Sequence, residues 1–169
     1  MKYMVISDIH GSIDVLNKVL NIYNKEKCNK LLILGDLFNY LYDINRNDIV
    51  NRLNSLRENI IAVRGNCDNN INDILFDMPY INNTKINDLK ITLTHGHLYD
   101  KNYLLKTDSN LILTGHSHVA DIEKINDKIF VNPGSISKSR LGENSFAIID
   151  NKNITIRNLN NEILLEESI

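Results

Sequence analysis

The chain has 169 residues, of which 43% are apolar and 24% charged, and its formal net charge is −2 at pH 7. This length and composition predict one globular domain over residues 1–169. Without a basic stripe, a long nucleic-acid polymer is not an expected partner, although a small nucleotide stays open. No run approaches the ~18 apolar residues of a membrane span, and the opening MKYMVISDIHG lacks the features of a signal peptide. Two cysteines, Cys28 and Cys67, predict no disulfide framework, so we expect a cytoplasmic protein with no membrane partner.

The first half of the chain alternates strand and helix patterns. Apolar runs at 3–7, 31–34 and 60–63 predict three buried strands. Helical spacing predicts one helix that begins after an N-cap at Ser12 and a second over 48–57. This βαβαβ order is typical of parallel strands covered by helices.

The second half is rich in strand patterns. A buried strand is predicted over 111–114 and a short helix over 98–106. The fold class we expect is therefore α/β, with two packed sheets and helices outside. Three hairpins are also predicted, with strands at 80–86 and 89–94 around Asn87-Asp88, at 122–125 and 128–131 around Asn126-Asp127, and at 145–150 and 154–159 around 151–153.

Side chains that bind metals follow five of the predicted strands at the point where each strand ends. All five histidines and five of the seven glycines lie within these segments, and a sixth glycine, Gly134, lies in the later motif NPGS. Sites in α/β sheets form beyond the carboxyl ends of parallel strands, so we expect these side chains to meet. The segments are VISDIHG, LILGDLF, IAVRGNCDN, ITLTHGH and LILTGHSH, and their candidate ligands are Asp8, His10, Asp36, Asn66, His95, His116 and His118.

This ligand set mixes carboxylate, imidazole and amide oxygen, which suits Mn, Fe or Zn better than a structural zinc site of the cysteine type. Seven ligands are too many for one ion. They suit two ions ~3.5–4 Å apart that share a carboxylate, the arrangement used for in-line displacement at phosphorus. Such a pair lowers the pKa of a bridging water and neutralises charge on the transferring phosphoryl group. The sequence therefore predicts a two-metal phosphoesterase.

The ordered blocks DIHG, GD, GNCD, HGH and GHSH, followed by NPGS, resemble the calcineurin-like metallophosphoesterases, in particular their small branch of YfcE-type phosphodiesterases. The resemblance covers nearly the whole chain and implies a four-layer αββα sandwich of two mixed sheets flanked by helices. It implies a shared, bridging carboxylate at Asp36. The first ion would be held by Asp8, His10, Asp36 and His118, and the second by Asp36, Asn66, His95 and His116.

The same resemblance implies hydrolysis of small phosphodiesters by attack of a metal-bridging hydroxide on phosphorus. Mn²⁺ is the first expectation for both ions, with Fe, Zn, Ni or Co as alternatives. Small members of the family are often dimers or tetramers, so a homo-oligomer is expected by analogy. The candidate catalytic residues are Asp36, Asn66, Cys67 and His97, and the candidate substrate contacts are Asn66, His97 and Arg64.

Two positions depart from many relatives. Cys67 stands where many have a histidine that is thought to protonate the leaving oxygen, although YfcE-like members also carry GNCD. A thiol, with a reference pKa of ~8.5, is a poorer acid at neutral pH than an imidazolium; nearby metals would lower that pKa or recruit the sulfur as a ligand. We therefore expect a preference for good leaving groups. After NPGS, the segment Ser137-Lys138-Ser139-Arg140 lacks the Pro-Arg that family members often have, which leaves open whether Lys138 or Arg140 approaches a phosphate.

Plainer interpretations exist for single residues. Arg64 fits an ordinary salt bridge, and His97 fits a partner that orients His95. Asp68 fits either a hydrogen-bonding role near the metals or a simple turn cap. Two other functions also fit the pattern. A scaffold without activity, as in the retromer subunit Vps29, which resembles this fold, is disfavoured because every ligand position is filled. A nuclease or nucleotide-processing enzyme would share the chemistry, but the lack of a basic surface argues against long polymers.

Overall fold

The computed structural model describes residues 1–40, 43–86, 89–151 and 153–169. The expected turn at Asn87-Asp88 lies outside these residues. The elements in chain order are β1 (Lys2–Ile6), α1 (Ile13–Lys25), β2 (Lys30–Ile33), α2 (Arg46–Asn54), a 3₁₀ turn (Arg57–Asn59), β3 (Ile60–Ala62), β4 (Ile81–Ile86), β5 (Leu89–Thr94), α3 (Lys101–Leu105), β6 (Leu111–Leu113), β7 (Ala120–Ile125), β8 (Lys128–Pro133), β9 (Ser145–Asp150), β10 (Asn153–Asn158) and β11 (Ile163–Ser168).

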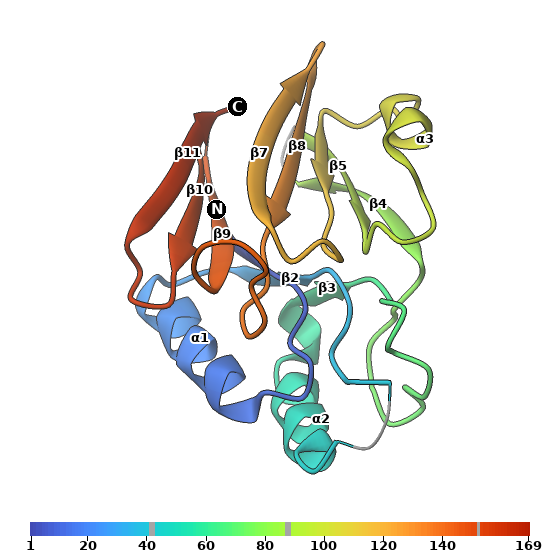
Figure 1. Ribbon diagram of the computed structural model, residues 1–169, viewed down its shortest axis with the longest axis vertical. Helices are drawn as coiled ribbons and strands as arrows, with labels where there is room; N and C mark the ends of the chain where they lie inside the picture. Colours follow the sequence, from blue (N-terminus) through green and yellow to red (C-terminus); the bar gives the residue numbers. More distant parts are fainter. Residues whose placement is uncertain (41–42, 87–88, 152) are drawn as a thin grey trace.

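Two mixed sheets form the centre of the molecule (Figure 1). The first has the strand order β11-β10-β9-β1-β2-β3, and the second has the order β4-β5-β6-β8-β7. β1, β2 and β3 are parallel, as the βαβαβ pattern predicted. In the second sheet β5, β6 and β8 are parallel. The loops that follow β1, β2, β3, β5 and β6 carry the candidate ligands.

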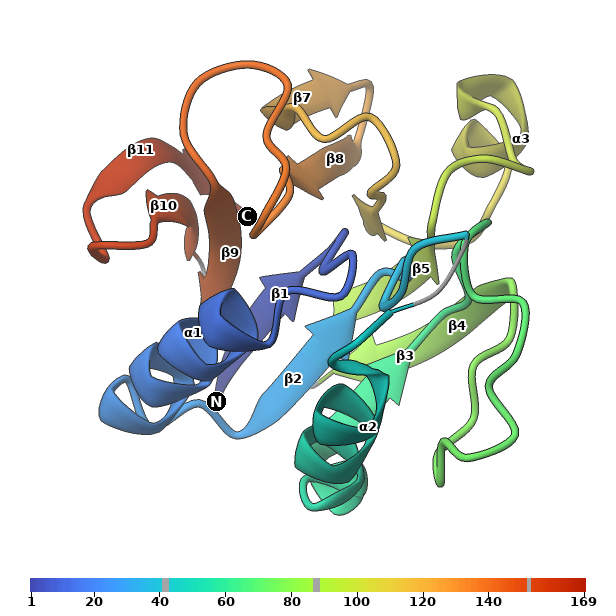
Figure 2. The same cartoon turned by 60° about the horizontal axis from the view of Figure 1, so that its bottom comes forward.

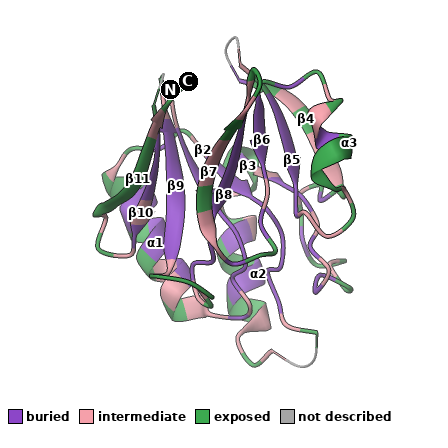
Figure 3. Ribbon diagram, turned by 45° about the horizontal axis from the view of Figure 1, so that its top comes forward, coloured by how far each residue is buried: buried purple, intermediate pink, exposed green. Residues whose placement is uncertain are grey.

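Apolar side chains pack the sheets into layers. α1 and α2 cover one face of the first sheet (Figure 2), where Leu16 and Ile49 contact the cluster built on Met4 and Ile6. The opposite face packs against the second sheet, and α3 lies on the outer side of the second sheet. Figure 3 shows the central strands buried and β11 exposed at one edge. The αββα sandwich is confirmed, with an outer layer of only one short helix on the second sheet.

Several strands differ from their predicted bounds by one or two residues, and three elements differ in a more informative way. The helix predicted over 48–57 runs from Arg46 to Asn54 and is followed by the separate 3₁₀ turn. The helix predicted over 98–106 covers only Lys101–Leu105, because the Asp100 carboxylate caps it by accepting from the Tyr103 backbone N–H at 2.8 Å. β11 was not predicted, since its residues are almost all exposed and give no alternation of apolar and polar side chains.

Other expectations hold in detail. The β7–β8 hairpin turns at Asn126-Asp127, with Ile125 paired to Lys128, and Asn126 has the positive φ of 56° that such turns favour. Ser12 occupies the N-cap of α1, but its side chain makes no capping hydrogen bond. Within the described ranges, none of the helices has the length and apolar character needed to cross a bilayer.

Glu26 links the end of α1 to β1 and to β10. Its carboxylate accepts from Lys2 Nζ at 2.8 Å and Asn161 Nδ2 at 2.7 Å, and Arg157 Nη1 lies 3.3 Å away. The hydrogen bond from Lys2, followed by that from Asn161, lowers the pKa of Glu26, and Glu26 in turn raises the pKa of Lys2. The stabilisation is therefore complete between the unfolded-state pKa values of about 4.3 and 10.4.

We expect Glu26→Gln to lower the free energy of unfolding by about 1 kcal/mol at pH 7. Because a lowered carboxyl pKa favours folding only above the unfolded value, the gap between wild type and variant should shrink as the pH falls through the folded pKa of Glu26. Urea unfolding of both proteins at pH 7 and pH 3 measures this. A gap of the same size at both pH values would contradict the ionic role of Glu26.

Candidate metal centre

The loops beyond the carboxyl ends of the strands bring ligand atoms from both sheets together. Three overlapping groups have their atoms within 4.8 Å of one another. Asp36 and Asp8 belong to two groups each, so the groups form one continuous cluster. The groups are Asp8, His10 and His118; His10, Asp36 and Cys67; and Asp8, Asp36 and His95.

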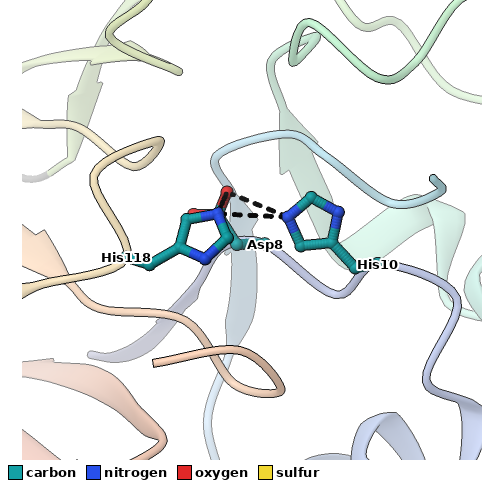
Figure 4. A group of neighbouring side chains, drawn as sticks. All are labelled: Asp8, His10 and His118. Carbon is teal, nitrogen blue, oxygen red and sulfur yellow. Dashed lines mark hydrogen bonds and ion pairs between the residues drawn. The ribbon is translucent and has the colours of Figure 1, made fainter. Parts of the chain in front are cut away.

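The first of these groups is shown in Figure 4. His118 Nε2 lies 3.1 Å from Asp8 Oδ1 and 3.1 Å from His10 Nε2. His10 Nε2 is also 3.7 Å from Asp8 Oδ1 and 3.7 Å from Asp36 Oδ2. Four side chains assigned to the first ion by the sequence resemblance therefore converge on one small space.

His95 is at the centre of the second set. Its Nε2 atom lies 3.4 Å from Asp36 Oδ2 and 3.1 Å from Asn66 Oδ1. Asp36 Oδ2 thus faces His95 on one side and His10 on the other. This is the position that a carboxylate shared by two ions requires.

The hydrogen bonds of two histidines leave lone pairs facing oxygen atoms. His95 Nδ1 lies 2.7 Å from the backbone carbonyl oxygen of Leu34, and His118 Nδ1 lies 2.7 Å from that of Lys138. Since a carbonyl only accepts, each Nδ1 carries the hydrogen, and each neutral ring presents the lone pair of Nε2. These lone pairs point at the Asp36 and Asp8 carboxylates. A proton or a metal cation between each pair of acceptors makes the contact favourable, so the residues fit a metal site.

Unpaired polar atoms and pKa shifts support the same conclusion. Asp8 Oδ1 and His10 Nδ1 are buried without a hydrogen-bond partner among the described residues. Burial alone would raise the pKa of Asp36, but His95 and the backbone N–H of Cys67 lower it to about 2. Burial lowers the pKa of His95, yet Asp36 and Asp8 raise it above its ordinary value overall. The centre therefore attracts positive charge.

The backbone is strained at the candidate ligands. Five of them have positive φ angles, a region that side-chain-bearing residues seldom occupy. Strain of this kind persists only where the surrounding structure enforces it, and it is concentrated at functional sites. The five residues are Asp8 (57°), His10 (45°), Asp36 (54°), His116 (66°) and His118 (59°).

A buried carboxylate at Asp68 holds the loop of Asp36 in place. Asp68 Oδ2 accepts from the backbone N–H groups of Asp36 at 2.8 Å and Gly65 at 2.9 Å. Asp68 Oδ1 accepts from those of Leu37 at 2.8 Å and Phe38 at 3.4 Å. The two loops lie so close that a Cβ atom at Gly65 would clash with Asp36. Of the two roles that the sequence offered for Asp68, these hydrogen bonds match the one near the candidate ligands and not the simple turn cap.

The segment 135–138, which begins at the last residue of NPGS, hydrogen-bonds to the loop of Asp8. Ser135 Oγ donates to the backbone carbonyl of Asp8 at 2.8 Å, and Ser137 Oγ donates to that of Ile9 at 2.9 Å. The Lys138 ammonium donates to Asn39 Oδ1 at 2.7 Å, at the rim of the centre. The segment therefore fixes two ligand loops, and its lysine is close to the centre.

Three other predicted site residues lie near the cluster but outside the three ligand groups. The His116 ring is exposed, with its centroid 5.1 Å from that of His95, and it belongs to none of the ligand groups found in the described residues. The His97 ring centroid is 5.3 Å from that of His95, and burial, followed by the charge of His95, lowers the pKa of His97. The Arg64 guanidinium lies 5.5 Å over the Tyr80 ring. The expected salt bridge of Arg64 is absent among the described residues, and its Nε atom is buried without a partner there.

Cys67 and Tyr40 surround the amide of Asn66. The Cys67 sulfur lies 3.5 Å from Asn66 Nδ2, and the Tyr40 hydroxyl accepts a hydrogen bond from the same nitrogen. Burial, followed by hydrogen bonding to Asp36, raises the pKa of Cys67 to about 12, so this thiol is protonated at neutral pH. Sequence reasoning missed Tyr40, because it lies in no motif.

Comparison with known proteins identifies the family of the chain. Residues 1–153 match the calcineurin-like phosphoesterase superfamily domain. The chain belongs to this superfamily. The phosphodiesterase YfcE of Escherichia coli strain K12 is 31% identical over an alignment 181 positions long, which covers 99% of this chain and 97% of that protein. The phosphodiesterase MJ0936 of Methanocaldococcus jannaschii is 27% identical, with coverage of 98% and 100%.

Solved structures of the superfamily show the same fold. The structure of the phosphoesterase YfcE from Escherichia coli superposes with a TM-score of 0.92 at 30% identity and covers 100% of both chains. Vps29 from Cryptosporidium parvum superposes with a TM-score of 0.71 at 20% identity over 99% of this chain and 98% of that one. The second likeness concerns the fold alone.

Proposed function

We propose that this protein is a two-metal phosphodiesterase that hydrolyses small phosphodiesters. The observation that best supports this proposal is the cluster in which the Asp8 carboxylate faces Nε2 of His118 and the Asp36 carboxylate faces Nε2 of His95. One ion would be held by Asp8, His10, Asp36 and His118, and the other by Asp36, Asn66, His95 and His116. When bound, such ions polarise phosphoryl oxygens and make water nucleophilic near neutral pH.

The chain's own residues would position the ester. Asn66 supplies an oxygen toward His95 and an N–H group toward the open side, where Tyr40 accepts it. The candidate contacts for the non-bridging phosphate oxygens are His97 and Arg64, whose Nε has no partner among the residues that the structure describes. Water adds to phosphorus as the alkoxide leaves, and Cys67 or solvent returns a proton to that alkoxide.

Several finer points belong to the same proposal. Mn²⁺ is the expected metal, because carboxylate, imidazole and amide ligands suit it. We also propose one domain over residues 1–169, a cytoplasmic location and assembly into dimers or tetramers. The apolar cluster between the two sheets, which joins strands from both halves of the chain, supports the single domain.

A hydrolysis panel tests the proposed activity. The purified protein, supplemented with Mn²⁺, would be given bis(p-nitrophenyl) phosphate, p-nitrophenyl phosphate, cyclic nucleotides and short RNA. We expect turnover that is highest on the small diester and abolished by a chelator. Metal binding without turnover on any of these esters would favour a scaffold role, and turnover that is highest on RNA would favour a nuclease.

The Cys67→His variant tests the leaving-group argument. An imidazolium with a pKa near ~6.5 is a better proton donor at neutral pH than a thiol. We expect kcat on diesters with poor, alkyl leaving groups to rise by roughly tenfold, and kcat on nitrophenyl esters, which need little protonation, to change much less. Cys28→Ser, at the other buried cysteine, is the matched control. If Cys67→His gains nothing on alkyl esters, the assignment of this position to the leaving oxygen is wrong.

A further inference from the structure

A cleft of about 310 Å³ opens directly beside the candidate metal centre. Its lining includes Cys67 and Tyr40 together with the start of α2. The Tyr40 hydroxyl is hydrogen-bonded to Asn66 Nδ2, so one wall of the cleft is joined to a proposed metal ligand. A group esterified to phosphorus at the centre would therefore extend into this cleft on the side of Cys67.

The charged groups of the cleft are already engaged within the protein. Arg46 pairs with Asp73 at 2.7 Å and covers the Phe38 ring at 4.0 Å. Both oxygens of Asp43 accept from Asn39, one from its backbone N–H at 2.6 Å and one from its side-chain amide at 2.7 Å. The Nη2 atom of Arg46 and both oxygens of Asp43 thus already have hydrogen-bond partners within the protein.

Neutral hydrogen-bonding groups, in contrast, are available. The side-chain amides of Asn47, Asn69 and Asn70 line the cleft and make no hydrogen bond within the part of the chain that the structure describes. The Tyr40 side chain is 65% exposed, which leaves its ring open for stacking. Amides that donate and accept beside an open aromatic ring suit a flat, uncharged, heteroaromatic group, because such a group stacks and pairs along its edge.

We propose that this cleft binds the organic leaving group of the substrate and that this group is a nucleoside. The inference rests on the phosphodiesterase function proposed above and narrows its substrate class to nucleoside esters of phosphate. A second cleft, of about 410 Å³, reaches the other side of His116, and its lining includes Tyr99, Phe130 and the ion pair of Lys101 with Glu123. Cys67, the residue assigned to the leaving oxygen, lines the first cleft and not the second, so the nucleoside is assigned to the first cleft.

The test combines binding with turnover. Binding of thymidine, the free alcohol product, to the purified protein would be measured by ligand-observed NMR with and without Mn²⁺. Hydrolysis would compare dithymidine monophosphate with bis(p-nitrophenyl) phosphate. The variants are Tyr40→Ala and the double variant Asn47→Ala/Asn69→Ala. Asn102→Ala, an exposed asparagine on α3, is the matched control.

We expect both cleft variants to weaken thymidine binding roughly tenfold, as the loss of base stacking or pairing does. We expect the double variant to raise KM for dithymidine monophosphate by a similar factor and to change KM for the nitrophenyl diester less than twofold. Asn102→Ala should match wild type throughout. If thymidine binds and the variants weaken it while no ester is hydrolysed, the proposed function fails but the subsite stands.

Two results would overturn the subsite while leaving the phosphodiesterase intact. These are no thymidine binding by a protein that hydrolyses the nitrophenyl diester, and equal losses on both diesters in the double variant. The last would mean that the asparagines act on the metal centre and not on the leaving group.

Discussion

Asp36→Asn is expected to lower kcat on bis(p-nitrophenyl) phosphate by on the order of 10³-fold. The carboxylate lies between His10 and His95, and its low pKa of about 2 keeps it ionised at every working pH. The amide has the same shape but no charge, so it cannot bridge two cations. Titration calorimetry with Mn²⁺ should show fewer than two ions bound per chain.

The control for this variant is Asp127→Asn, at an exposed carboxylate in the β7–β8 turn. It should keep wild-type turnover and metal content. Circular dichroism and unfolding midpoints would show whether Asp36→Asn is folded. A folded Asp36→Asn protein with full activity would exclude the proposed mechanism.

Asp68→Asn is expected to lower the free energy of unfolding of the metal-free protein by about 3 kcal/mol. Both oxygens of Asp68 only accept, and together they take four backbone N–H groups. In Asp68→Asn, an NH₂ group replaces one of the two oxygens. This group cannot accept, so the backbone N–H groups that faced that oxygen would be buried without a hydrogen-bond partner. Urea unfolding measures this loss. We also expect weaker Mn²⁺ binding, because Asp68 holds the left-handed backbone of Asp36.

Asp73→Asn is the matched comparison, since it removes a partly exposed carboxylate that pairs with Arg46 on the surface. We expect Asp73→Asn to lower the free energy of unfolding by less than about 1 kcal/mol. If Asp68→Asn costs no more than Asp73→Asn, then the four amide contacts do not hold the loop. A Mn²⁺ affinity unchanged from wild type would confine Asp68 to a role in folding.

Much of the candidate site could be predicted, because most of its residues directly follow a strand that the sequence pattern identifies. A polar residue directly after a buried strand lies at the carboxyl end of that strand, and β1, β2 and β3 are adjacent and parallel. That rule alone places Asp8 and Asp36 in neighbouring loops. The pairing of the two halves of the chain, which adds His95 and His118, followed from the ordered blocks and not from periodicity.

Other features depend on contacts that no local pattern encodes. The role of Asp68 requires knowing which amides meet it across some thirty residues of sequence, from Leu37 to Asp68. Tyr40 reaches Asn66 only because the loops after β2 and β3 are neighbours. The predicted ligand His116 is exposed. Its position after a strand does not predict how far its side chain is buried. β11 escaped prediction since it covers no core.

The most direct test of the account is the anomalous diffraction of crystals grown with Mn²⁺. We predict two peaks ~3.5–4 Å apart with the Asp36 carboxylate between them. One peak should lie against Asp8, His10 and His118, and the other against Asn66, His95 and a turned His116 ring. A single peak in a crystal of protein that hydrolyses diesters with full activity would contradict the two-metal centre.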